Sequence, residues 1–171
     1  MRNVTADVLA EGFTLAGDVA DVPHESATVV HRAFRAPDGV TYLVFTFATE
    51  SPIRIESASV WRARWPVVCT SVLCQTFLRE VDRVETMNHE HPFAAVGRTP
   101  PCVHFAAVPP ETHWLDQYRE HSERVKDWAA DTGSRPVKHE PFERFVERQN
   151  EIAELEYVAY WNRPAPAAPS E

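Results

Sequence analysis

A stretch near the N-terminus, SATVVHRAFRAPDGVTYLVFTFATES, constrains the fold more strongly than any other part of the chain. Two runs of β-branched and aromatic residues flank Pro37-Asp38-Gly39, a combination typical of a tight turn between antiparallel strands. The sequence therefore predicts a β-hairpin over residues 27–48. Its second arm, residues 40–48, is apolar on both faces, and such a strand belongs in the middle of a sheet. The hairpin must therefore have further strands beside it.

Two further segments have the composition of strands. In PIRIESASVWRARW, residues 52–65, the apolar side chains of Ile53, Ile55 and Trp61 share one parity and the charged side chains share the other. Since alternate residues of a strand point to opposite faces, this pattern predicts a third strand with one face in water. A short fourth strand is predicted over residues 102–108, between two Pro-Pro pairs that cannot donate to a hydrogen-bonded ladder.

Three segments have apolar residues at helical spacing. Residues 69–85 support two readings, because their apolar spacing fits a helix whereas residues 67–72 have the composition of a strand. We expect a helix there. Residues 111–133 show a 3.6-residue period closed by Gly133, which predicts an amphipathic helix. Residues 141–161 repeat this pattern and predict a last helix.

These elements predict one α+β domain over residues 1–163, in which an antiparallel sheet of about four strands packs against two or three helices. A chain of 171 residues is long enough to bury one sizeable core. Residues 164–171, PAPAAPSE, have little that could pack against a core, so we expect them to form an exposed, flexible tail.

Composition disfavours several classes of function. The formal net charge of -8 argues against nucleic acid as a partner, because that affinity depends on clustered Lys and Arg. No run approaches the roughly 20 apolar residues of a membrane helix, so we expect a cytoplasmic protein with no membrane partner. Three cysteines without a CxxC pair predict reduced, mostly buried thiols rather than a disulfide framework. Five glycines and no Gly-rich phosphate loop argue against a nucleotide cofactor.

The clearest candidate for chemistry is MNHEHPF, residues 87–93, which places His89 and His91 around a glutamate. In an extended segment both imidazoles would leave the same face, and His104 on the predicted strand that follows could approach them. Three such histidines would suit zinc or ferrous iron, or proton transfer near neutral pH without a metal. The alternative is a helix C-terminus with histidines in its last turn and a proline stop. The sequence leaves the metal and any cofactor open.

Aromatic side chains supply candidate ligand contacts. The chain has five tryptophans and four tyrosines, and rings with polar tips line both ligand pockets and protein interfaces. We expect His31, Trp61 and Tyr118 to contact a ligand. The predicted function is a small pocket protein that binds an apolar or aromatic molecule, with the three histidines above as acid/base residues if it is an enzyme. The alternative is a non-catalytic subunit that assembles, as a homo-oligomer or with another protein, through its aromatic C-terminal helix.

Overall fold

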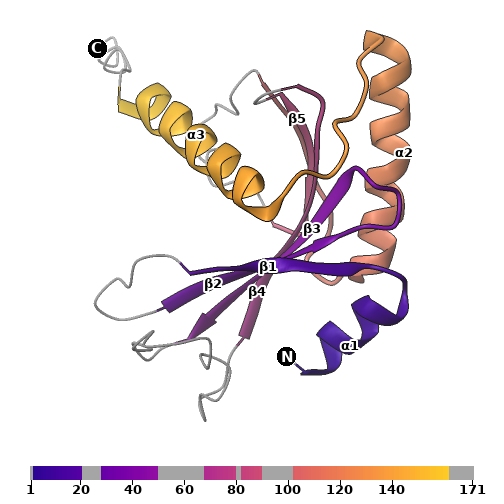
Figure 1. Ribbon diagram of the computed structural model, residues 1–171, viewed down its shortest axis with the longest axis vertical. Helices are drawn as coiled ribbons and strands as arrows, with labels where there is room; N and C mark the ends of the chain where they lie inside the picture. The colour runs from indigo at the N-terminus through magenta and orange to yellow at the C-terminus, as the bar shows by residue number, and fades with distance from the viewer. Residues whose placement is uncertain (1, 21–27, 50–67, 80–81, 90–101, 162–171) are drawn as a thin grey trace, which may run out of the picture.

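The computed structural model describes residues 2–20, 28–49, 68–79, 82–89 and 102–161 (Figure 1). The elements, in chain order, are α1 (Arg2–Ala10), β1 (Thr14–Ala20), β2 (Thr28–Arg35), β3 (Thr41–Thr49), β4 (Val68–Phe77), β5 (Arg83–Met87), β6 (Val103–Ala107), α2 (Trp114–Thr132) and α3 (Phe142–Trp161). The strands lie in chain order across one sheet, and neighbours are antiparallel except for β5 and β6, which are parallel. The α+β class is confirmed, but among the described residues the sheet has six strands rather than about four and is mixed rather than purely antiparallel.

The predicted hairpin is present as β2 and β3. The Ala36 amide donates to the Thr41 carbonyl across the turn at 2.9 Å. The Asp38 carboxylate accepts hydrogen bonds of 2.9 Å from the amides of Val40 and Thr41, and Gly39 has a positive φ of 79°. Asp thus supplies an acceptor for the turn backbone, and Gly tolerates the left-handed conformation. β3 pairs with β2 on one side and β4 on the other, so its predicted central position is confirmed.

The helix expected over residues 69–85 is wrong, because this segment contributes to β4 and β5. β4 is covered on both faces: Cys74 packs with residues of α1 and α2, and Phe77 packs with residues of α3. A strand covered on both sides loses the polar–apolar alternation that identifies strands, and its apolar residues can then imitate helical spacing. The alternative that MNHEHPF begins in the last turn of a helix is also wrong, because Met87 is the last residue of the strand β5 (Arg83–Met87).

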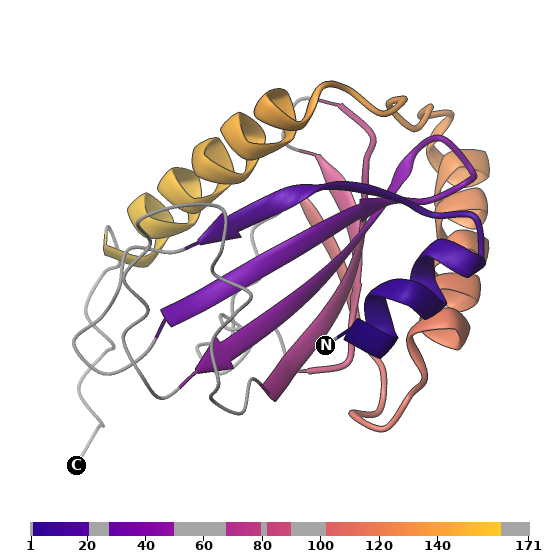
Figure 2. The same ribbon diagram turned by 60° about the horizontal axis from the view of Figure 1, so that its bottom comes forward.

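Helices cover both faces of the sheet (Figure 1, Figure 2). We call the face that packs against α1 and α2 the α2 face, and the opposite face the α3 face. In Figure 1, β1 and β2 run across the view and β5 stands upright, so the sheet is strongly twisted and α3 lies on the inner side of the bend. The core of the α2 face is mainly apolar and includes Val8, Phe13, Phe34, Leu43, Phe45, Phe47, Val72, Cys74 and Trp114. The apolar core of the α3 face includes Ala33, Tyr42, Val44, Phe77, Phe145 and Ile152.

The two predicted C-terminal helices and the last short strand are confirmed as α2, α3 and β6. α2 ends at Gly133, whose φ of 65° is the left-handed conformation typical of a helix cap. The sequence did not predict α1 or β1, because each short segment has only two or three large apolar residues. The strand expected over residues 52–65 and the tail 164–171 lie outside the described residues.

Two further findings concern the helices and the cysteines. None of the described helices is long and apolar enough to cross a membrane. All three cysteines are free thiols, as expected, but only Cys74 is buried, while Cys102 is partly exposed and Cys69 is exposed.

Candidate functional site

The predicted histidines do not form one described site. His89 lies two residues after the end of β5 and is exposed. His91 and Trp61 lie outside the described residues. His104 lies on β6 and packs against α2, whereas His31 lies on β2 with Thr46 on the α3 face, so the sheet separates the two rings. Among the described residues no group of three or more His, Cys, Asp and Glu side chains is placed to hold a metal ion. The roles of His89 and His91 stay predictions.

His104 forms a pair with a carboxylate at the edge of the sheet. Its Nε2 atom lies 3.0 Å from Asp82 Oδ1, and the side chains are 21% and 32% exposed. The imidazole stacks on the indole of Trp128, with ring centroids 3.6 Å apart. The Arg124 guanidinium donates to the His104 carbonyl at 3.4 Å, which links β6 to α2. The ring is thus held in orientation by a charge and an aromatic face, and its edge remains partly accessible.

Tyr118 lies on the α2 face, away from His31. Its hydroxyl donates to the Asp38 carboxylate at 3.2 Å, and its ring meets Phe13 edge-on at 5.0 Å. Burial, and next the negative charge of Asp38, raises the pKa of Tyr118 to about 12. The hydroxyl therefore stays protonated at neutral pH and fastens α2 to the hairpin turn. Its role as a ligand contact stays a prediction.

His121 is the most buried of the described histidines, at 0% exposure. Its Nε2 and Nδ1 atoms lie 2.9 and 3.0 Å from the hydroxyls of Thr76 and Thr86. Burial, and next the positive charge of Arg124, lowers the pKa of His121 to about 3. Its neighbour on α2, Gln117, is also fully buried and donates to two strand carbonyls. These α2 side chains are neutral and bonded to fixed groups, which identifies them as structural contacts.

The α3 face contains charged side chains inside the protein. Gln75, Arg83 and Glu85 are 0%, 2% and 4% exposed. The Gln75 amide donates to Glu85 Oε1 at 2.8 Å, and the Arg83 guanidinium donates to the same oxygen. The side-chain amide of Gln149 on α3 donates to the side-chain oxygen Oε1 of Gln75. We call these four residues the inner polar cluster.

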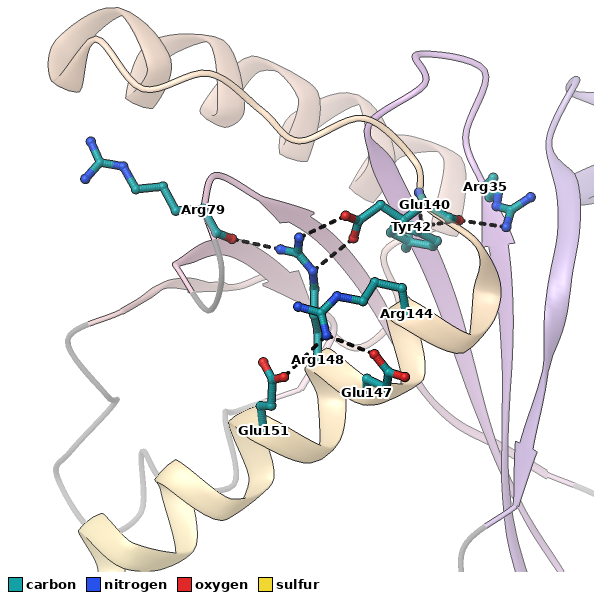
Figure 3. Close-up of polar contacts among 8 residues, drawn as sticks. All are labelled: Arg35, Tyr42, Arg79, Glu140, Arg144, Glu147, Arg148 and Glu151. Atoms are coloured by element: carbon teal, nitrogen blue, oxygen red, sulfur yellow. Dashed lines mark hydrogen bonds and ion pairs between the residues drawn. The ribbon is translucent and has the colours of Figure 1, made fainter.

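Arg148 precedes Gln149 of this cluster in the sequence and is 7% exposed. Figure 3 shows its contacts with Arg79 and Glu140. Its Nη1 donates to the Arg79 carbonyl at 3.0 Å, and its Nη2 donates to Glu140 Oε1 at 3.1 Å. Its Nε lies 3.0 Å from the other carboxylate oxygen of Glu140. The guanidinium carbon also lies 5.1 Å from the centre of the Phe77 ring, close enough for a cation–π contact. One side chain thus connects α3 to the sheet and to the segment that precedes α3.

Next to the buried cluster, the α3 face becomes half-exposed. We call this part the rim, and it consists of His31, Thr46, Ser71, Leu73 and Met87, all partly exposed. His31, Thr46 and Ser71 are register partners across β2, β3 and β4, and Leu73 pairs with Met87 on β5. The His31 Nδ1 lies 3.1 Å from the Thr46 hydroxyl. The rim therefore combines an imidazole and two hydroxyls with two flexible apolar side chains.

Sequence reasoning missed the inner polar cluster because it assigned residues 69–85 to a helix. With β5 as a strand, Arg83, Glu85 and Met87 share one face, and Val84 and Thr86 share the other. The alternation in RVETM was therefore the available signal. No local signal pointed to Arg148 and Gln149, because their contacts with the sheet depend on where α3 crosses it.

The fold and these clusters define a class of α+β protein in which helices pack on both faces of one mixed sheet, with buried charges on one face only among the described residues. No family model matches the chain, and no curated protein or solved structure is significantly similar to it. The function is therefore inferred from the residues described above.

Proposed function

We propose that the protein binds a small molecule on the α3 face, between the inner polar cluster and the rim. The ligand would have an apolar or aromatic body and at least one hydrogen-bonding group. The observation that carries this proposal is the burial of Gln75, Arg83 and Glu85 directly beside the half-exposed Leu73 and Met87. Small-molecule sites commonly combine apolar walls with a few polar groups in fixed positions. The proposal keeps the predicted pocket function but rests on different polar residues.

Stability alone gives little reason for the charges in this cluster. Moving the Arg83 and Glu85 charges out of water costs several kcal/mol per ion, and apolar replacements of buried ion pairs are often neutral or stabilising. The α2 face fills its polar positions differently, since His121 and Gln117 are neutral and bond to threonine hydroxyls and backbone carbonyls. A pair of interior charges is therefore better explained by recognition of a polar group than by stability.

His31 is the sequence-predicted ligand residue that lies on this face. An imidazole can donate from one nitrogen and accept at the other, so it suits a ligand hydroxyl, amide or carboxylate. Its position at the rim, rather than in the core, leaves it partly exposed. His31 would therefore contact the outer end of a ligand whose polar group points toward Glu85.

A thermal-shift panel of metabolites tests this proposal, because a ligand at about 100 times its dissociation constant stabilises a protein by about 2.7 kcal/mol. We expect a compound that raises the melting temperature of the native protein and binds more weakly to His31→Gln and Glu85→Gln. His113→Gln is the matched control, because it makes the same change at an exposed position before α2. Retention of full affinity in both α3-face variants, or no stabilising compound in the panel, would contradict the proposal.

A second function, proton transfer by His104, is favoured by its 3.0 Å pair with Asp82. Such a carboxylate fixes the orientation of an imidazole, and general acid/base catalysis depends on a positioned proton donor or acceptor. If a panel compound is slowly converted, loss of turnover in His104→Gln with retained binding would support this function. Unchanged turnover would exclude it. Assembly through the aromatic end of α3 stays a prediction, because the side chains of residues 155–161 lie outside the described part of the chain.

A further inference from the structure

The first half of α3 has two different kinds of contact with the sheet. Its N-terminal end is seated by aromatic rings: Phe142 lies against Gly17 of β1, and Phe145 packs on Tyr42 with ring centroids 4.3 Å apart. The next turn is polar instead, with the buried Arg148 and the partly exposed Gln149 facing the β4–β5 hairpin. The two kinds of contact follow each other along a single helix.

The segment just before α3 is fixed to the β2–β3 hairpin. The Glu140 carbonyl accepts a hydrogen bond of 2.8 Å from Arg35, and the Glu140 amide donates to the Tyr42 hydroxyl at 3.2 Å (Figure 3). The amide of His139 donates to the Gly39 carbonyl at 2.9 Å. These contacts and the Phe142 seat hold the start of α3 in place, so any movement of the helix would pivot there.

Among the described residues, Arg148 is the charged side chain of α3 that bonds to the segment after β4. Its carboxylate partner, Glu140, belongs to the fixed pivot and orients the guanidinium, while its contact on the sheet is the Arg79 carbonyl after β4. Arg144, one turn earlier, differs sharply: it pairs with Glu147 at 2.9 Å on the helix surface, and both side chains are exposed. Arg148 therefore links α3 to the sheet, whereas the Arg144–Glu147 pair lies within α3 itself.

The hydrogen bond between Arg148 and the Arg79 carbonyl can break and re-form at little cost. Separating an aromatic ring from its seat exposes apolar surface to water, which is unfavourable throughout the movement. Separating Arg148 from the Arg79 carbonyl instead returns a guanidinium to water, and its hydration offsets much of the lost hydrogen bond. The polar turn can therefore open while the aromatic seat stays closed, although Ile152, one turn further along α3, must then leave the apolar core of the α3 face.

We propose that α3 pivots on its Phe142–Phe145 seat and that the Arg148–Arg79 contact, oriented by Glu140, is the latch that keeps the inner polar cluster covered. This inference rests on the proposed function, because the opening would give a ligand access to Gln75 and Glu85. Closure would then restore the contact between Gln149 and Gln75 or replace it with a ligand group.

Hydrogen–deuterium exchange of the full chain without ligand tests the latch. Arg148→Met keeps an apolar stem over Phe77 but removes the hydrogen bonds, and Glu140→Gln keeps the shape but removes the charge. We expect Arg148→Met to speed exchange in residues 146–161 by about tenfold, as loss of a charged hydrogen bond implies, with β3 and β4 unchanged. We expect a smaller increase in the same residues for Glu140→Gln. The control Arg144→Met should change exchange there by less than about twofold.

Unchanged exchange in residues 146–161 of both latch variants would overturn the inference. So would an equal increase in every strand, because α3 would then open only with global unfolding. If Arg148→Met fails to fold, Glu140→Gln alone decides between these outcomes. The experiment contains no ligand, so its failure refutes the latch even when a panel compound binds, and the absence of binding refutes the proposed function even when α3 opens.

Discussion

The contact between Phe142 of α3 and Gly17 of β1 can be tested by the sign of one stability change, that of Gly17→Ala. A Cβ atom added to Gly17 would lie 2.7 Å from Phe142 Cζ and closer still to Cε1, whereas real Cβ contacts essentially never fall below 3.0 Å. Gly17 has no positive φ, so its backbone would accept alanine. Without a clash, Gly→Ala in a strand stabilises a protein by about 0.5–1 kcal/mol. With the clash, overpacking should destabilise this protein by about 1–3 kcal/mol.

Urea unfolding of Gly17→Ala, Phe142→Ala and the double variant measures this contact. We expect Gly17→Ala to lower the free energy of unfolding in the native background and to be neutral or stabilising when Phe142 is alanine. The coupling energy should then reach about 1 kcal/mol or more. A stabilising effect of Gly17→Ala in the native background, or additive effects in the cycle, would show that Phe142 does not sit on Gly17 and would remove the pivot of α3.

Three further predictions concern the α2 face. Because the pKa of His121 is lowered from 6.5 to about 3, the unfolded chain binds the extra proton, so stability is full above about pH 6.5 and falls as the pH drops toward 3. Urea unfolding should show a loss of about 2 kcal/mol from this group between about pH 6.5 and pH 5, which His121→Gln removes and the exposed-site control His113→Gln does not. Gln117→Leu removes the side-chain donor of the Thr86 and Val72 carbonyls, of which Val72 keeps a hydrogen bond of 3.2 Å from the Asn88 amide. It should lower the free energy of unfolding by about 1–3 kcal/mol, and a change under about 0.5 kcal/mol would contradict that hydrogen-bond assignment. Asp82→Asn should cost at most about 1 kcal/mol because the pair is partly exposed, and a larger loss in the same assay would show that the pair is structural.

Much of the fold follows from local sequence. The Pro37-Asp38-Gly39 turn, the β-branched arms around it and the Gly133 cap each act within a few residues, so their structures could be predicted without tertiary information. The β4–β5 hairpin could not be predicted in the same way. Helices cover both of its faces, and the pattern that separates strand from helix is lost when neither face meets water.

The site was less predictable than the fold. The spacing of His89 and His91 drew attention to histidine chemistry, but spacing along a chain does not determine which face of a sheet a side chain occupies. Strand parity places His31 and His104 on opposite faces, which only the strand register could reveal. Long-range contacts such as Arg148 with Arg79, separated by 69 residues, leave no local pattern.

The methyl group of Met87 offers the most direct test of a ligand site on the α3 face. The chain has two methionines, Met1 and Met87, so a spectrum of protein labelled with carbon-13 at the methionine methyl groups has one reporter at the rim and one at the N-terminus. Met87→Leu assigns the two resonances. Addition of a stabilising panel compound should shift the Met87 resonance in proportion to occupancy and leave that of Met1 unchanged. A compound that stabilises the protein without moving the Met87 resonance would contradict binding at this face.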